Sequence, residues 1–258
     1  MRFKATIAYD GRPFRGWQSQ VGGVTVQDEL EAAAAKVAKV ERVPFHGAGR
    51  TDAGVHALGQ VAHFDAPETS KLDAHAWLTA INAHLPQAIR VIACEEASPD
   101  FHARFDTLGK TYRYRVFHGR VLSPFEDGLI WHLRRKIDLT VLRDLASEFV
   151  GEHDFSAFAG FRGNEPKDCK PDPQFTTRTI YDIRIEPDGE YLNMEFSGSG
   201  FLYHMVRLIT GSLLQTATGR DDPERILDHL HSPRGRKTSI CAPADGLYLV
   251  EVRYPESK

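Results

Sequence analysis

The residues best suited to chemistry lie in one glycine-rich segment, residues 46–56 (HGAGRTDAGVH), directly before a predicted strand. It holds a guanidinium, a hydroxyl and a carboxylate, from Arg50, Thr51 and Asp52, among three glycines. Glycine permits close approach of the backbone to a ligand, and loops on a rigid scaffold often carry reactive groups. Asp52 is therefore a candidate reactive group, although the spacing equally allows a turn residue that accepts backbone hydrogen bonds.

A second segment, residues 110–115 (KTYRYR), combines aromatic rings with cations. At a period of two, Lys110, Tyr112 and Tyr114 share one face of a strand, and Arg113 and Arg115 share the other. Rings flanked by cations can stack bases and hold phosphates. The alternative is a half-buried strand whose tyrosines pack in a core and whose arginines lie in water.

A third segment, residues 201–207 (FLYHMVR), places Arg207 in an otherwise apolar helical stretch. Burying a guanidinium without a partner is very costly, so we expect either a carboxylate partner from an active site or an arginine that reaches out to solvent.

Other chemistries find little support in the sequence. The glycines follow G-x-G-x4-G, which is neither the dinucleotide fingerprint nor a P-loop, and no HExxH, GxSxG or metal-spaced Cys/His cluster is present. The three cysteines are far apart and odd in number, which excludes a disulfide framework and fits a reducing, cytoplasmic setting. No apolar run approaches the roughly 20 residues that span a bilayer.

The charge of the chain is nearly balanced, with 32 basic and 35 acidic residues among 258, a net charge of −3. Residues 101–120 nevertheless carry a local charge of +4 and residues 1–20 one of +3. Such local fields can steer a polyanion. They predict either an RNA path or ordinary solvated faces.

The elements that must position these residues follow from periodicity and turn signals. We expect a helix capped by Thr25, a helix from Leu72 to Ile81, and a helix over 139–149. A long loop is expected over 151–176, then a helix over about 203–218 and a short helix from Asp222. The predicted strands cover residues 2–9, 60–66, 89–95, 109–118, 178–186, 190–196 and 247–254.

This order predicts an α+β fold of two similar halves. We expect mostly antiparallel sheets joined into one central sheet, helices on one side, and an active-site cleft between the halves. The expected domains are residues 1–105, with the Asp52 loop, and residues 106–258, with the tyrosine strand and Arg207.

Eight short motifs, spread over essentially the whole chain, match one family in order and spacing. The sequence thus resembles the bacterial tRNA pseudouridine synthase A (TruA) family. The matching motifs are YDG (9–11) with GWQ (16–18), AGRTDAGVH (48–56) with GQV (59–61), Asn82 with LP (85–86), FHAR (101–104), YRY (112–114), GEHDF (151–155), HMVR (204–207) and GLYLV (246–250).

The resemblance implies isomerisation of uridine to pseudouridine at positions 38, 39 and 40 of the tRNA anticodon stem-loop. Asp52 matches the catalytic aspartate, Arg50 the arginine linked to entry and flipping of the target nucleotide, Tyr112 the tyrosine that packs on the uracil, and Arg207 the arginine that ion-pairs with the aspartate. The resemblance also implies a homodimer that acts on tRNA and needs no metal or other cofactor.

Binding of the tRNA would then involve further residues. We expect Arg104, Arg113, Arg115 and the run 234–237 (RGRK) to contact phosphates. We also expect Leu247 to bind the substrate. The loop 162–174 is longer and more charged than the family leads us to expect.

The first chemical step stays open between attack of Asp52 at C1′ and loss of the C2′ proton through a glycal. An ionised carboxylate serves both routes, and a nearby Arg207 would favour that form. Two other functions stay open as well: an RNA-binding module of the same fold without catalysis, and a small-molecule hydrolase with Asp52 as nucleophile.

Overall fold

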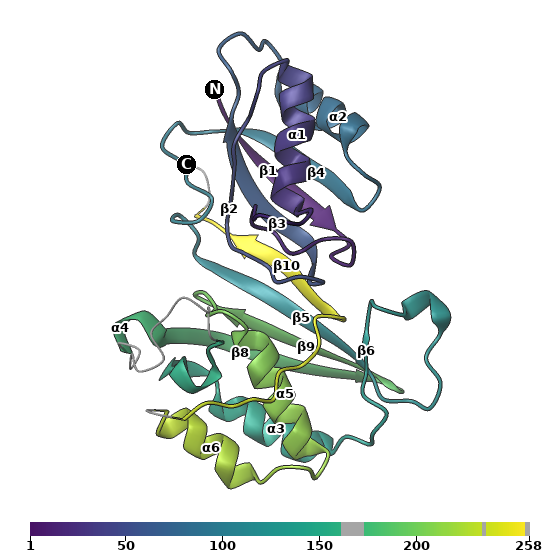
Figure 1. Cartoon of the computed structure of the whole chain (residues 1–258). Coiled ribbons are helices and arrows are strands. Elements are labelled where there is room, and N and C mark those ends of the chain that lie inside the picture. The colour runs from purple at the N-terminus through teal and green to yellow at the C-terminus, as the bar shows by residue number, and fades with distance from the viewer. Residues whose placement is uncertain (161–172, 234–235, 256–258) are drawn as a thin grey trace. The chain divides into compact units, whose positions relative to one another are not determined.

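The computed structural model describes residues 1–160, 173–233 and 236–255 (Figure 1). The chain forms two compact units, one of Met1–Lys110 with the C-terminal segment from Tyr248 onward, the other of Thr111–Leu247. In the described residues, one mixed sheet of ten strands is accompanied by six α-helices. The expected α+β class and the single central sheet are confirmed.

In the first unit, the strands follow the order β4, β1, β3, β10, with β2 beside the end of β3. β1 pairs antiparallel with β3 and β4, whereas β10 runs parallel to the start of β3, with Tyr248 opposite His56. The alternation predicted for residues 2–9 is confirmed, because every second side chain from Phe3 to Tyr9 is buried. The bounds are β1 Arg2–Tyr9, β2 Phe45–Gly47, β3 His56–Asp65, β4 Ile89–Ala97 and β10 Leu247–Arg253.

Two helices of the first unit, α1 (Val26–Ala38) and α2 (Ala74–His84), pack against each other. The predicted cap of α1 is confirmed, since the Thr25 side chain accepts a hydrogen bond from the Asp28 amide. The Trp77 ring of α2 meets Phe64 of β3 edge to face, with centroids 5.3 Å apart. Helix and sheet thus share one aromatic core.

In the second unit, the strand order is β5, β9, β8, β7, with β6 beside β5. Helices α3, α5 and α6 pack against one another, and α3 also packs on β8. The strands are β5 Gly109–Phe117, β6 Trp131–His132, β7 Gly151–Asp154, β8 Thr177–Asp188 and β9 Tyr191–Gly198, and the helices are α3 Leu139–Glu148, α4 Pro173–Thr176, α5 Met205–Ala217 and α6 Pro223–His231, with 3-10 turns η1 Pro124–Glu126 and η2 Phe155–Phe158.

The loop expected over residues 151–176 is wrong at both ends, because β7 and η2 occupy its start and the short helix α4 (Pro173–Thr176) its end. Gly151–Asp154 forms β7, because it pairs antiparallel with Thr177–Ile180 of β8. Phe155 and Phe158 of η2 are fully buried, which is unlike a solvated loop. Of the charged loop predicted at 162–174, residues 162–172 lie outside the described residues.

Three predicted starts of elements are also corrected. Strand β3 begins at His56 rather than residue 60, because pairing with β10 extends it. Helix α2 begins after Leu72, since Asp73 caps it through the Ala76 amide. Helix α5 begins at Met205, since His204 has a left-handed φ of 60°.

No helix in the described ranges has both the length and the apolar character that a bilayer crossing requires.

Candidate active site

The loop that carries Asp52 connects β2 to β3 in the first unit, and its backbone is held at several points. The Ala48 amide donates to the Val61 carbonyl at 2.7 Å, and the Thr51 carbonyl accepts from the Trp17 amide at 3.1 Å. The Val55 amide donates to the Asp52 carbonyl at 3.1 Å, so Asp52 does open a turn. Its side chain belongs to a half-buried residue on a fixed backbone, an arrangement that suits a reactive group.

Three side chains also form hydrogen bonds with the Asp52 loop. The Gln60 Nε2 atom donates to the Gly49 carbonyl and the Lys110 Nζ atom to the Ala48 carbonyl, each at 2.8 Å. The hydroxyls of Tyr9 and Thr51 lie 2.8 Å apart. Burial raises the pKa of the Tyr9 hydroxyl, so this group stays protonated.

The sequence did not predict that Gln60, Lys110 and Tyr9 would hold the Asp52 loop. The sequence offered one signal, a glutamine at the start of the predicted strand 60–66. The structure shows this amide fully buried, and a buried amide needs partners for both of its polar atoms. For Lys110, the period of two predicts only the face of the strand on which it lies. The sequence does not tell which backbone carbonyl its long side chain contacts.

Two glycines allow the turn after β1 to touch this loop. A Cβ atom at Gly11 would lie 2.1 Å from the Val55 carbonyl oxygen. Gly16 has a φ of +89°, and a Cβ there would lie 2.6 Å from the Thr51 carbonyl oxygen. Any larger residue would push the Asp52 loop away.

His56 closes the loop and is almost fully buried. Its Nδ1 atom accepts from the Gly11 amide at 3.1 Å, and its ring stacks on Tyr248 with centroids 4.6 Å apart. The Gly11 contact uses the Nδ1 lone pair, so the neutral imidazole carries its proton on Nε2. The same nitrogen lies 3.3 Å from Asp10 Oδ1, and the two side chains make an ion pair when the imidazole is protonated.

Asp10 is also held by Arg12, at 2.6 Å. The pKa of Asp10 lies below its ordinary value: burial raises it, but the hydrogen bonds and charge of Arg12 outweigh that effect.

Arg50 and Arg104 are both exposed in the first unit. The Arg50 Nε atom donates to the Gln18 Oε1 atom at 3.2 Å. The Arg104 guanidinium lies 5.8 Å from the centre of the Phe105 ring. In the described part of the chain, it meets no carboxylate.

In the second unit, β5 places its tyrosines and arginines as the period of two predicts. Tyr112 and Tyr114 are buried, whereas Arg113 and Arg115 are half-exposed. The Tyr112 ring meets Phe201 edge to face, with centroids 5.3 Å apart. The Tyr114 hydroxyl donates to the Pro243 carbonyl, and burial raises the pKa of Tyr114 although the nearby Arg207 charge opposes this.

Arg207 lies in the first turn of α5 and is half-buried. Its Nε atom donates to the Ala242 carbonyl at 2.9 Å, and the Ala242 amide donates to the Arg207 carbonyl at 3.0 Å. This double contact fixes the base of the guanidinium, so Arg207 is no freely moving surface arginine. The predicted ion pair with Asp52 stays a prediction.

Several predicted phosphate ligands already have partners. Arg113 pairs with Glu195 at 2.6 Å and Arg115 with Glu126 at 3.0 Å. Of the run 234–237, Arg236 pairs with Asp228 at 2.6 Å, Lys237 donates to the Ala159 carbonyl at 2.8 Å, and Arg234 and Gly235 lie outside the described residues. Leu247, predicted to bind substrate, is buried at the start of β10.

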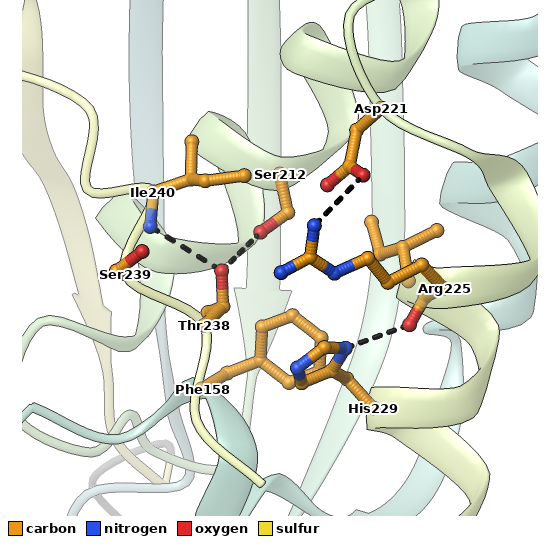
Figure 2. A pocket seen from close by; sticks show the side chains of 9 residues that line it. Phe158, Ser212, Asp221, Arg225, His229, Thr238, Ser239 and Ile240 are labelled. Carbon is orange, nitrogen blue, oxygen red and sulfur yellow. Dashed lines mark hydrogen bonds and ion pairs between the residues drawn. The ribbon is translucent and has the colours of Figure 1, made fainter.

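A cavity in the second unit is lined by none of the predicted catalytic side chains. Its volume is about 20 Å³, which suits one water molecule rather than a nucleobase. Figure 2 shows its lining, where Arg225 pairs with Asp221, and Thr238 contacts Ser212. Among the described residues, no group of three or more His, Cys, Asp or Glu side chains could hold a metal ion.

Comparison with known proteins identifies the family. Residues 5–106 and 145–255 match the family model described as tRNA pseudouridine synthase. The chain belongs to the tRNA pseudouridine synthase family. Members of this family are isomerases that modify RNA, and the resemblance stated from the motifs is confirmed.

Individual relatives agree with this family over nearly their full length. The chain is 46% identical to tRNA pseudouridine synthase A of Akkermansia muciniphila over 257 residues, covering 99% of this chain and 96% of that protein. It is 40% identical to tRNA pseudouridine synthase A of Bacillus subtilis, covering 98% and 99%. A solved structure titled "Crystal Structure of a Cbf5-Nop10-Gar1 Complex" covers 96% of this chain and 48% of its own at 14% identity, with a TM-score of 0.41, a likeness too weak to support any argument.

Proposed function

We propose that this tRNA pseudouridine synthase converts uridine to pseudouridine at positions 38, 39 and 40 of the anticodon stem-loop. Asp52 starts the reaction, Tyr112 packs on the uracil, and Arg207 ion-pairs with the Asp52 carboxylate. Arg50 assists entry of the flipped nucleotide, since a base within a stem must leave its stack to be modified.

The reaction breaks the N1–C1′ bond, turns the uracil within the enzyme, and joins C5 to C1′. Asp52 either attacks C1′ or promotes a glycal by removing the C2′ proton, and both routes use the ionised carboxylate. Tyr112 offers an aromatic face to the detached base. Its hydroxyl assists removal of the C5 proton.

One structural observation supports Asp52 above all: its loop is fixed on both sides. Before Asp52, backbone partners from Trp17 and Val61 and side-chain partners from Gln60 and Lys110 hold the segment 48–51, and after it the Val55 amide closes the turn on the Asp52 carbonyl. A nucleophile or base must be held to within about 0.5 Å of its working position. A loop made only of glycine and exposed turn residues would not achieve this.

The direct test is Asp52→Asn, assayed by tritium release from tRNA labelled with [5-³H]uridine. We expect a loss of at least about 1000-fold, because an amide can neither attack C1′ nor accept the proton. Asp73→Asn is the matched control, since asparagine caps a helix as well as aspartate does. Near wild-type release from Asp52→Asn would leave the chain without its assigned catalytic group.

The positions modified are tested in tRNA from a strain lacking this gene. Carbodiimide adducts mapped by primer extension should vanish at positions 38 to 40 and return when the gene is restored. Loss of adducts elsewhere would contradict the assignment.

We further propose that the enzyme acts as a cytoplasmic homodimer on tRNA without a cofactor. Sedimentation at micromolar concentration should give about twice the 28.9 kDa of one chain. Fractionation of cells should place it with soluble proteins, and full turnover should persist after treatment with a chelator.

A further inference from the structure

A line of buried polar groups runs from helix α1 to the loop that carries Arg50. Gln27 and Glu31 of α1 are 8% and 7% exposed, although both are polar. The Gln27 Nε2 atom donates to Glu31 Oε1 at 2.8 Å and to the Phe45 carbonyl at 3.1 Å. Nothing in the chemistry assigned to Asp52 uses these groups.

The orientation of the Gln27 amide is fixed by its partners. Its Oε1 atom accepts from Gln18 Nε2 at 2.6 Å and from the Ser19 amide at 3.0 Å. Turning the amide over would place its NH₂ group against those two donors and its oxygen against Glu31 and the Phe45 carbonyl. Such a reversal leaves four polar contacts unmade, two of them buried and two part-buried, so only one orientation is stable.

Glu31 lies at the end of this network that is furthest from Arg50. Its Oε1 atom also accepts from the Phe45 amide at 3.1 Å, and its Oε2 atom accepts from Arg42 Nε at 2.7 Å. Phe45 belongs to β2, the strand that leads into the Asp52 loop. The network therefore ties α1 to the same strand that delivers Arg50.

The fixed amide of Gln27 also fixes the orientation of the Gln18 side-chain amide. Because Gln18 gives its NH₂ group to Gln27, its carbonyl oxygen faces Arg50 and accepts the Nε hydrogen at 3.2 Å. This is the only hydrogen bond that the Arg50 side chain makes among the described residues. Held at Nε, the guanidinium keeps its two terminal nitrogens for a ligand.

We propose that Gln18, Gln27 and Glu31 are positioning residues that orient the Arg50 guanidinium toward RNA. Their order of action runs from the Glu31 carboxylate through the Gln27 amide to Gln18. The inference rests on the proposed function, which assigns Arg50 to entry of the target nucleotide. None of the three residues needs to touch RNA for this role.

The test begins with Gln18→Met, which removes the acceptor for Arg50 while Gln27 Oε1 keeps the Ser19 amide. The control is Gln20→Met, two residues further along the chain at an exposed position, where the side-chain amide donates to the Arg15 carbonyl. We expect Gln18→Met to lower the single-turnover rate about 5-fold, the size of one lost hydrogen bond. The control should keep the wild-type rate.

A double-mutant cycle shows whether Gln18 acts through Arg50. In an Arg50→Met background, Gln18→Met should cause no further loss, because the group that it positions is already absent. An equal 5-fold loss in both backgrounds overturns the proposal. Glu31→Gln should give a smaller loss that also disappears in that background.

A measurement without substrate separates this inference from the proposed function. In ¹⁵N-arginine-labelled protein, the Arg50 Nε–H resonance, assigned by its absence in Arg50→Met, should exchange with solvent about 5-fold faster in Gln18→Met than in Gln20→Met. Equal exchange overturns the positioning role. If the wild type forms no pseudouridine but exchange rises as expected, the proposed function fails and the positioning of Arg50 stands.

Discussion

At the scale of single residues, the hydroxyl of Tyr9 joins the first strand to the residue beside Asp52. Tyr9 is 5% exposed and Thr51 6%, so water offers little replacement for their mutual hydrogen bond. A buried hydroxyl that loses a hydrogen bond costs free energy, because water does not reach it to replace the lost partner.

Tyr9→Phe should therefore lower the free energy of unfolding by about 1 to 2 kcal/mol. The ring still packs beside Trp17, with centroids 6.1 Å apart, so the loss belongs to the hydroxyl. Urea denaturation measures it, and Thr51→Val provides the partner for a double-mutant cycle. Additive losses in the double variant would show that the two hydroxyls do not interact.

A second residue-scale property concerns His63, which is 2% exposed in β3. Its Nδ1 atom accepts from the Ala103 amide at 3.1 Å, and its ring contacts those of His46 and His102. Burial, followed by the neighbouring charges of His102 and His46, lowers the pKa of His63 from 6.5 to about 4.

Because the folded pKa of His63 lies below the unfolded one, the unfolded chain binds the proton more readily between pH 6.5 and 4. Stability should fall as the pH drops through that window, by up to about 1.4 kcal/mol per pH unit. His63→Asn keeps an acceptor for Ala103 and removes the titration, so its unfolding free energy should change less between pH 6.5 and 4.5. The exposed His75→Asn variant serves as control and should behave like wild type.

At the scale of elements, the turn after β1 and the Asp52 loop touch through backbone alone. Gly11 has no Cβ, and the space that one would occupy is filled by the backbone of Gly54 and Val55. The two segments are more than 40 residues apart in the sequence. Their contact therefore depends on how β1 and β3 pair.

Gly11→Ala should displace the Asp52 loop, because backbone atoms at 2.1 Å cannot be moved as a flexible side chain can. We expect a loss of about 2 kcal/mol in unfolding free energy and at least about 10-fold in pseudouridine formation. The control is Gly200→Ala, whose Cβ would meet only Arg178 Nε at 3.9 Å. Equal activity of the two variants would contradict the close packing of turn and loop.

Several elements followed from local signals, and others did not. The cap at Thr25, the start of a helix at Asp222 and the alternation of Phe3 to Tyr9 are visible in the sequence because each involves neighbours within a few residues. Strands β2 and β6 have three and two residues, too few for any period. The sequence predicts a loop where β7 lies, because β7 is extended only through its pairing with β8.

At the scale of the whole molecule, a net charge of −3 has to coexist with tRNA binding. Many cations are already matched to carboxylates, as Arg113 and Arg115 show. Arg104 is exposed and meets no carboxylate in the described part of the chain. It is therefore better placed for a phosphate than the two arginines of β5.

Binding of tRNA should weaken steeply as salt rises, because each phosphate contact releases counterions. Arg104→Gln should reduce the slope of log K against log salt concentration by about 1. Arg184→Gln, an exposed arginine paired with Asp182 at 2.8 Å, should leave it unchanged. Filter binding at several salt concentrations measures both, and an unaltered slope for Arg104→Gln would refute its phosphate contact.

The sequence by itself determined the α+β class, the period of β1 and β5, and the motifs that carry the family resemblance. These properties depend on neighbours along the chain or on the order of short segments. The assignment of Asp52, Tyr112 and Arg207 came from that resemblance, whereas spacing alone left Asp52 open between a turn and a reactive group.

Only the tertiary structure decided what holds the Asp52 loop and the Arg50 side chain. The loop is contacted by residues from other segments of the chain: Gln60, Lys110, Trp17 and Gly11. In addition, β10 from the C-terminal end pairs with β3. These contacts join residues from about 10 to almost 200 positions apart, and no local pattern encodes them. They exist because strand pairing brings distant backbone atoms within hydrogen-bond reach.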